Sequence, residues 1–206
     1  PANTVRLLAV SKQQDAGQIR ALYAAGQIAF GENYVQEALA KQAVLTDLAI
    51  EWHFIGQIQR NKTRDLAAHF DWVHSVDRLL IAERLSAQRS GDLKPLNLCI
   101  EVNIDGEDTK GGCPPEAVPG LVESMSRLPN VRLRGLMVIP AKTSSDGPDP
   151  FQRAQAVFEQ VRSFHSVPED WDTLSMGMSA DLEQAIAAGA TMVRVGTALF
   201  GARSAK

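Results

Sequence analysis

The chain has 206 residues, enough for one domain with a sizeable hydrophobic core, and its hydrophobic share of 45% and charged share of 22% are those of an ordinary globular protein. Its net charge of −3 gives no overall positive field that would attract nucleic acid or an anionic membrane. No apolar run approaches the roughly 20 residues of a membrane-spanning helix. Cys99, in an apolar run, and Cys113, in a Gly-Gly-Cys-Pro-Pro turn, predict reduced thiols in a cytoplasmic protein.

Short β-type runs alternate with amphipathic helical segments along the whole chain. Eight runs are predicted to be strands, over residues 6–11, 28–31, 52–56, 72–76, 96–104, 131–139, 173–178 and 192–196. Seven segments between them have the helical period, over residues 15–26, 33–48, 61–69, 78–89, 115–128, 150–165 and 180–188. Gly26 and Gly189 are placed to end helices, and Asp77 and Ser179 to begin them as N-caps.

Eight strands with a helix between each successive pair predict a single (β/α)8 TIM-type barrel over residues 1–206, in the α/β class. A doubly wound sheet would use the same alternation, but its strands would be apolar on both faces. In the run 96–104, Leu98 and Ile100 fall on one face, while Cys99 and Glu101 fall on the other. One apolar and one partly polar face favour a barrel whose lumen opens onto a site.

The carboxyl ends of the strands carry the functional residues of such barrels. Polar side chains stand at or near most of these ends: Lys12, Glu32, Asn33, His53, Ser75, Asp77, Glu101, Asn103, Ser175, Ser179, Arg194 and Thr197. We therefore predict a site at this rim of the barrel.

Lys12 follows the first apolar run, and alternation places Leu8, Val10 and Lys12 on one face. An inward-facing lysine is desolvated, which lowers the pKa of its amine and makes the neutral form available for a Schiff base. The alternative is a lysine whose aliphatic stem covers the rim while its amine stays in water.

The last strand carries Arg194 on the same face as Gly196. A buried guanidinium needs a partner, which would be Glu101, a ligand atom or both. Gly196 and Thr197 allow backbone N–H groups to approach an anion, and Ser175 and Ser179 add hydroxyls where phosphate sites occur in this fold. Alternatively, Ser179 only caps the following helix. A lysine that faces an anion site suggests a covalently held phosphorylated aldehyde.

The four histidines, His53, His69, His74 and His165, lack metal-ligand spacing, so we predict no metal site. His53 either lines the pocket or is a core histidine whose nitrogens are satisfied.

Six motifs together resemble the pyridoxal 5′-phosphate homeostasis proteins, and the resemblance runs in order over essentially the whole chain. They are AVSK at 9–12, FGENYVQE at 30–37, WHFIG at 52–56, RGLM at 134–137, LSMGMS at 174–179 and VRVGT at 193–197. The resemblance implies a barrel similar to the N-terminal domain of alanine racemase, of fold type III among pyridoxal phosphate (PLP) proteins, with PLP as an internal aldimine on Lys12.

The same resemblance implies roles for further residues of the rim. Ser179, Gly196 and Thr197 would hold the phosphate, and Arg194 would lie by the pyridine nitrogen. Asn33, His53 and Met137 would line the ring. This chain departs from the family in two places. Many members carry a second lysine where this chain has Gln14, which leaves open how the cofactor is handed over. Members usually carry an additional helix before the first strand, where few residues precede Arg6 here, so one end of the barrel is less covered or the sequence is trimmed.

An arginine beside the pyridine nitrogen keeps that nitrogen unprotonated and weakens the ring as an electron sink. Alanine-racemase-like enzymes take a second acid–base residue from a C-terminal β domain, which we do not expect here, because the chain ends soon after its eighth strand.

The leading hypothesis is therefore a monomeric, cytoplasmic PLP carrier with no catalytic residue of its own, which supplies PLP-dependent apoenzymes. The alternatives are a PLP-dependent amino-acid racemase and a Schiff-base aldolase that acts on a phosphorylated sugar.

Overall fold

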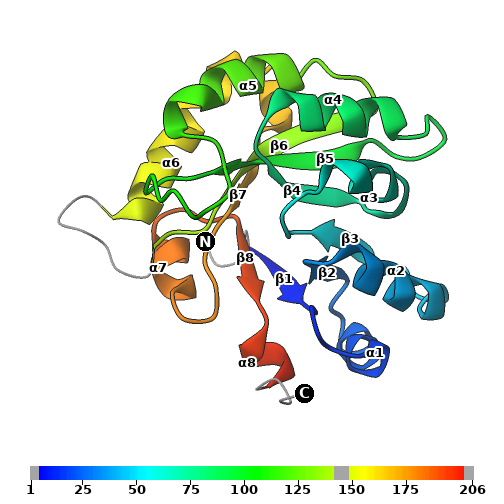
Figure 1. Ribbon diagram of the computed structural model, residues 1–206. Helices are drawn as coiled ribbons and strands as arrows, with labels where there is room; N and C mark the ends of the chain where they lie inside the picture. The colour runs from blue at the N-terminus through cyan, green and yellow to red at the C-terminus, as the bar shows by residue number, and fades with distance from the viewer. Residues whose placement is uncertain (1–4, 142–148, 202–206) are drawn as a thin grey trace.

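In the computed structural model, which describes residues 5–141 and 149–201, eight parallel strands form one closed barrel with helices around its outside (Figure 1). The strands are β1 (Arg6–Val10), β2 (Ala29–Glu32), β3 (Glu51–Phe54), β4 (Trp72–Val76), β5 (Leu96–Val102), β6 (Val131–Val138), β7 (Thr173–Ser175) and β8 (Met192–Val195). They follow one another around the barrel in chain order. The prediction of a (β/α)8 barrel is confirmed, and every predicted strand is present.

The helices follow the strands in alternation. They are α1 (Ala16–Ala24), α2 (Val35–Val44), α3 (Thr63–His69), α4 (Leu79–Gln88), α5 (Val118–Met125), α6 (Pro150–Val161), α7 (Leu182–Ala187) and α8 (Thr197–Phe200). Short 3₁₀ turns lie at Arg60–Lys62, Pro115–Ala117, Arg162–Phe164 and Pro168–Asp170. Among the described residues, no helix has both the length and the apolar character needed to cross a membrane.

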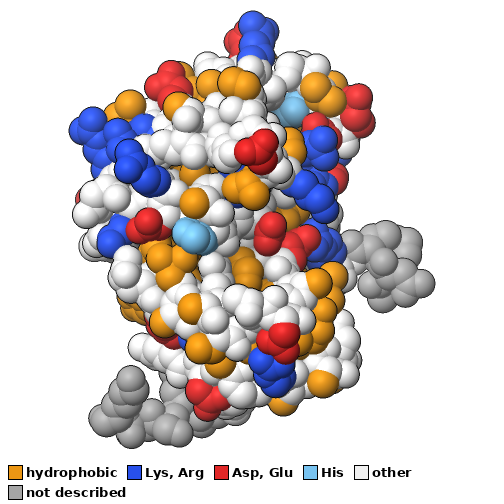
Figure 2. Space-filling view, turned by 90° about the vertical axis from the view of Figure 1, so that its right-hand side faces the viewer, with side chains coloured by type: hydrophobic (Ala, Val, Ile, Leu, Met, Phe, Trp, Pro, Cys, Tyr) orange, Lys and Arg blue, Asp and Glu red, His pale blue; other side chains and the backbone are white. Residues whose placement is uncertain are grey.

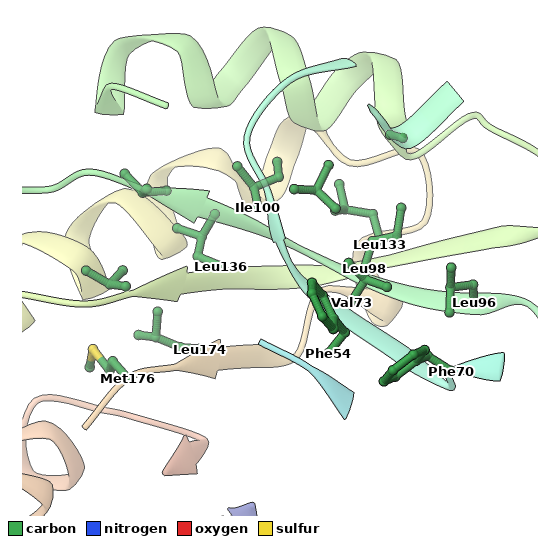
Figure 3. Close-up of a cluster of buried hydrophobic side chains, with 14 of the residues drawn as sticks. Phe54, Phe70, Val73, Leu96, Leu98, Ile100, Leu133, Leu136, Leu174 and Met176 are labelled. Atoms are coloured by element: carbon green, nitrogen blue, oxygen red, sulfur yellow. The ribbon is translucent and has the colours of Figure 1, made fainter. Parts of the chain in front are cut away.

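Side chains alternate between two separate cores. The larger core fills the layer between strands and helices, and Figure 3 shows part of it, including Phe54, Leu98, Ile100 and Leu174. Two small clusters come from the opposite faces of the strands and fill part of the lumen: Leu8, Ala29 and Met192 form one, and Trp72, Cys99 and Met137 form the other. The alternation predicted for β5 is confirmed, since Cys99 lies in a lumen cluster while Leu98 and Ile100 lie in the outer core.

One glycine allows β6 to break this alternation. The pairing of β5 with β6 shifts between Leu98 and Cys99, so that Leu133 and Leu136, three residues apart, both lie in the outer core. Gly135 sits at the shift with φ +155°, and a Cβ at this residue would lie 1.7 Å from the carbonyl oxygen of Thr173. Only glycine fits this close approach.

Most differences from the predicted elements are at their ends. Gly26 and Gly189 follow the C-caps of α1 and α7 with positive φ, as predicted. The N-cap predictions are wrong: α4 begins after Arg78, whose side chain pairs with Asp77, and α7 begins after Asp181. Strand β7 ends before Gly177, whose φ of +91° leaves the extended region.

The part of the surface shown in Figure 2 carries acidic and basic side chains side by side, with hydrophobic groups between them. This mixture agrees with the small net charge of the chain. Cys99 and Cys113 are both buried free thiols.

Candidate functional site

Closure of the barrel pairs the first strand, β1, with the last strand, β8, so the carboxyl ends of both lie at the same mouth of the barrel. Strands β1 and β8 pair with Leu8 opposite Arg194, and the backbone oxygen of Val10 would lie 3.3 Å from a Cβ on Gly196. Lys12 stands two residues beyond Val10, in the turn that follows β1, and is partly buried. The structure therefore brings Lys12, Arg194 and Gly196 to the same region of the rim, as the alternation predicts.

Arg194 is buried and held by groups of two neighbouring strands. Its Nη1 donates to the carbonyl oxygen of Ser175 at 2.8 Å and to the Ser175 hydroxyl at 2.9 Å, and its Nη2 donates to the carbonyl oxygen of Val138 at 2.9 Å. The sequence named Glu101, a ligand atom or both as its partner; in the structure its acceptors are these three oxygens, and Glu101 acts on it through charge. Burial lowers the pKa of Arg194 to about 10 and the charge of Glu101 raises it, so the guanidinium stays charged at neutral pH.

Three acceptors do not use all five N–H donors of a guanidinium, so Arg194 keeps donors for a ligand. Ser175, which was predicted as a phosphate ligand, is fully buried beneath this arginine and also contacts His74. Its place in the site is therefore next to Arg194.

His53 lies inside the lumen and is fully buried. Its ring stacks on Trp72 with centroids 5.2 Å apart, its Nδ1 is 2.9 Å from His74 Nε2, and its Nε2 is 2.6 Å from Glu51 Oε1. Both ring nitrogens thus have protein partners, as the core-histidine alternative predicts. Met137 is also buried, packed against Trp72 and Cys99. A contact of His53 or Met137 with a ligand stays a prediction.

The turn that carries Lys12 is held by a buried ion cluster. Lys41 Nζ lies 2.7 Å from each of three oxygens: the Ser11 carbonyl, Glu32 Oε1 and Glu37 Oε1. Ser11 Oγ donates to Glu32 at 2.6 Å, and the backbone N–H of Gln13 donates to Glu37 at 2.5 Å. Gln13 has φ +62°, a left-handed conformation that is uncommon for this residue type, so these bonds fix a strained turn directly after Lys12.

A cavity of about 200 Å³ opens at the carboxyl ends of β2, β3, β5 and β6. It is lined by Asn33, Ile55, Gly56, Gln57, Glu101, Val102, Asn103, Thr109, Lys110, Gly111 and Ile139. A second, more open cavity of about 610 Å³ shares Asn33, Gly56 and Gln57 with it and extends over Tyr34. The buried Oδ1 of Asn33 has no hydrogen-bond partner in the part of the chain that the structure describes. An unpartnered buried acceptor at a cavity is available for a ligand donor.

Glu101 is the acidic residue of the smaller cavity. Burial and the charge of Asp77 together raise its pKa to about 7, against the opposing charge of Arg194. The side chain is therefore close to half protonated at neutral pH.

The predicted anion-binding residues lie at the ends of β7 and β8. Gly196 is the N-cap of α8, so the backbone N–H groups of Thr197 and Ala198 belong to a first turn, where no intrahelical acceptor exists. The side chains of Ser179 and Thr197 are exposed. Their positions suit an anion at the rim, and binding of one there remains a prediction.

Sequence reasoning missed three polar residues: His74 and Lys41, which are buried, and Glu51, which is partly buried. His74 alternates with Trp72 on β4, and that pattern could have placed it in the lumen. Lys41 stands four residues after Glu37 on α2, which is a helical pairing distance. The role of Glu51 has no comparable sequence signal, because it depends on Arg6 and His53 lying beside it.

Three comparisons with known proteins identify the family and the fold of this chain. The model of the family "Alanine racemase, N-terminal domain" matches residues 2–204. A protein of Pseudomonas aeruginosa named pyridoxal phosphate homeostasis protein is 58% identical over 202 residues, which are 97% of this chain and 85% of that protein.

Two solved structures of PipY from Synechococcus elongatus PCC7942 have the same fold. The one without PLP is 44% identical with a TM-score of 0.82 and covers 97% of this chain and 94% of its own. The one with PLP bound is 43% identical with a TM-score of 0.79 and covers 96% and 93%.

Proposed function

The chain belongs to the alanine racemase N-terminal domain family and, within it, to the pyridoxal phosphate homeostasis proteins, and from this we propose that it binds pyridoxal 5′-phosphate as a carrier. The observation that carries the proposal is the pairing of β1 with β8, which brings the end of β1, two residues before Lys12, beside Gly196, with Arg194 on the same strand β8. PLP supplies an aldehyde, a phosphate and a pyridine nitrogen, and the residues of this rim include an amine, a helix start and a guanidinium that suit these three groups.

In this proposal Lys12 holds the cofactor covalently. Its neutral amine condenses with the aldehyde to form a carbon–nitrogen double bond, and one water leaves. The backbone N–H groups at Gly196 and Thr197, with the exposed hydroxyls of Ser179 and Thr197, bind the phosphate. Asn33 fits a ligand group through its unpartnered Oδ1.

Arg194 limits the chemistry that bound PLP would supply, which fits a carrier, although racemases of this fold tolerate the same arrangement. A guanidinium that keeps its proton at neutral pH cannot give one to a ring nitrogen, so the ring accepts electrons from a carbanion poorly. We therefore propose storage and delivery of PLP to apoenzymes by a monomer, and the two buried free thiols favour the reducing cytoplasm.

The test is the visible spectrum of the protein with added PLP, followed by borohydride reduction and mapping of the labelled peptide. We expect a yellow wild-type protein that is labelled at Lys12, and a Lys12→Ala variant that is neither yellow nor labelled. Lys110→Ala, which removes a second lysine of the mouth, is the matched control and should keep the label on Lys12. A wild-type protein that takes up no PLP contradicts the proposal and moves the aldolase alternative forward.

Glu101 favours one second candidate, a racemase-like enzyme, because a cavity carboxyl with a pKa of about 7 can act as a general acid or base. The carrier proposal predicts no turnover of L- or D-amino acids by the PLP-loaded protein. Racemisation or transamination that disappears in both Lys12→Ala and Glu101→Gln would establish the enzyme instead.

A further inference from the structure

A continuous line of hydrogen bonds crosses the lumen from Arg194 to the amino-terminal edge of the barrel. Ser175 Oγ accepts from Arg194 and lies 3.2 Å from His74 Nδ1. The other nitrogen of that ring, Nε2, is 2.9 Å from His53 Nδ1. The line ends at Glu51, whose Oε1 is 2.6 Å from His53 Nε2. Ser175 and both rings are buried, so water does not compete for these bonds.

The two ends of this line give it a direction. Arg194 can only donate, because a guanidinium carries N–H groups and no acceptor. Glu51 can only accept. Its partial burial raises the pKa, but the hydrogen bond from the neutral ring of His53 and the charge of Arg6 outweigh burial and hold the pKa of this carboxyl below its usual range. Arg6 adds its own hydrogen bond to the same carboxylate at 2.6 Å.

The groups between the ends can each donate once and accept once. Burial lowers the pKa of His53 against the opposing effect of Glu51, and burial with nearby positive charges holds the pKa of His74 well below its usual range. Both rings are therefore neutral, with one N–H and one bare nitrogen each. The Ser175 hydroxyl likewise has one proton to give.

These constraints leave one consistent arrangement. His53 donates from Nε2 to the carboxylate and accepts at Nδ1. His74 then donates from Nε2 to His53, and its Nδ1 accepts the hydroxyl proton of Ser175. Because its one proton is donated to His74, the hydroxyl oxygen of Ser175 can only accept from Arg194. Each donor along the line faces an acceptor.

We propose that Glu51, His53, His74 and Ser175 are positioning residues that act in series as a one-way hydrogen-bond chain, the lumen chain, which holds the guanidinium of Arg194 in a single orientation. For the bound cofactor this inference rests on the proposed function, in which Arg194 meets the ring nitrogen. The chain links the cofactor side of the barrel to a carboxylate at the opposite edge.

The arrangement of protons is testable without cofactor. Long-range ¹H–¹⁵N correlation spectra of the wild-type protein should show both His53 and His74 as Nε2–H tautomers, unchanged between pH 7 and 8.5. The Nη protons of Arg194 should be resolved, because a held guanidinium rotates slowly. An Nδ1–H tautomer, or a titration of either ring in this range, overturns the directional chain.

Three variants test the positioning. His74→Phe breaks the lumen chain with a ring of similar size, whereas His74→Gln keeps one hydrogen-bond acceptor and one donor. Cys99→Ala is the control, because Cys99 packs in the lumen but makes no hydrogen bond of the lumen chain. In His74→Phe we expect the Arg194 Nη signals to average and PLP affinity to fall about tenfold, the loss of roughly one hydrogen bond. His74→Gln should recover part of both, and Cys99→Ala should match the wild type.

The outcomes separate this inference from the proposed function. If His74→Phe retains resolved Arg194 signals and wild-type affinity, the positioning role is wrong although PLP binds. If His74→Phe does not fold, the tautomers of the wild type and the PLP affinity of His74→Gln still test the positioning role. If the wild type binds no PLP, the proposed function fails, while the histidine tautomers and the Arg194 signals still support or overturn the lumen chain.

Discussion

At the scale of single residues, this barrel differs from an ordinary protein core in the number of ionisable groups that it buries. Burial lowers the pKa of Arg194 from 12.5 to about 10, which still leaves the guanidinium charged at neutral pH. Glu101 is 9% exposed, and burial raises its pKa from 4.5 to about 7, so this carboxyl is close to half protonated there. Burial thus shifts both groups toward their neutral forms, and their charges at neutral pH differ because their ordinary pKa values lie far apart.

The raised pKa of Glu101 predicts a pH dependence of stability. In the unfolded chain this carboxyl titrates near its ordinary value of 4.5, and in the folded protein near 7. Between these values the folded state keeps a proton that the unfolded state has lost. The contribution of Glu101 to the free energy of unfolding therefore falls as pH rises from 4.5 to 7, by up to about 3 kcal/mol.

Urea denaturation of the cofactor-free protein at pH 5 and pH 8 measures this effect. Glu101→Gln has no such proton, so it should gain stability relative to the wild type as pH rises. Glu123→Gln, which changes an exposed carboxylate paired with Arg127, is the control and should follow the wild type. Parallel curves for the wild type and Glu101→Gln would show that the pKa is not raised.

At the scale of elements, α2 fixes the turn after β1. Lys41 reaches from this helix to the carbonyl of Ser11, and Glu37 holds the backbone of Gln13, so Lys12 stands between two anchored neighbours. Glu32, fully buried, joins the same cluster and has one oxygen without a partner among the described residues. Burial raises the pKa of Glu32, against the hydrogen bonds from Lys41 and Ser11.

We expect Lys41→Met to be strongly destabilising, by about 3–5 kcal/mol at pH 7, because it leaves the buried carboxylate of Glu32 without its cation. The loss should shrink toward pH 5, where Glu32 can take a proton instead. Lys41→Met should also weaken PLP binding, because the turn beside Lys12 is released. Chemical denaturation and PLP titration at both pH values measure these effects.

Arg20→Met is the matched control for Lys41→Met, since it breaks the exposed Arg20–Asp47 pair, and it should change stability little. Adding Glu32→Gln to Lys41→Met should restore part of the stability. Equal losses in the free energy of unfolding for Lys41→Met and Arg20→Met would mean that the buried cluster does not hold the turn.

Elements were predictable where several residues repeat one pattern. The alternation of β5 depends on which residues of one strand face the same way, and it agrees with the structure. Helix α8 was missed because its four residues are too few to show a helical period. The N-caps at Asp77 and Ser179 failed because Asp77 pairs with Arg78, and because a turn delays α7 until after Asp181.

At the scale of the whole molecule, the candidate site is assembled from strands that are distant in the chain. The alternation of side chains along a strand shows which of them turn inward, but not which of them meet across the lumen. The contact between His74 and Ser175 depends on the relative heights of β4 and β7, which the closure of the sheet sets. For this reason Lys12 and Arg194 were predictable from sequence, whereas the acceptors of Arg194 and the path to Glu51 required the structure.

The order of the strands also bears on how the protein folds. Seven of its pairings join strands that follow each other in the chain, and only that of β1 with β8 joins the two ends. Distant segments meet at a greater cost in chain entropy than neighbours do, which slows their pairing. The bond between His74 and Ser175 spans 101 positions, so the lumen chain cannot form until β4 and β7 both stand in the barrel. A nascent chain therefore acquires its oriented arginine only when the barrel closes, and the PLP site proposed above exists only in the closed barrel.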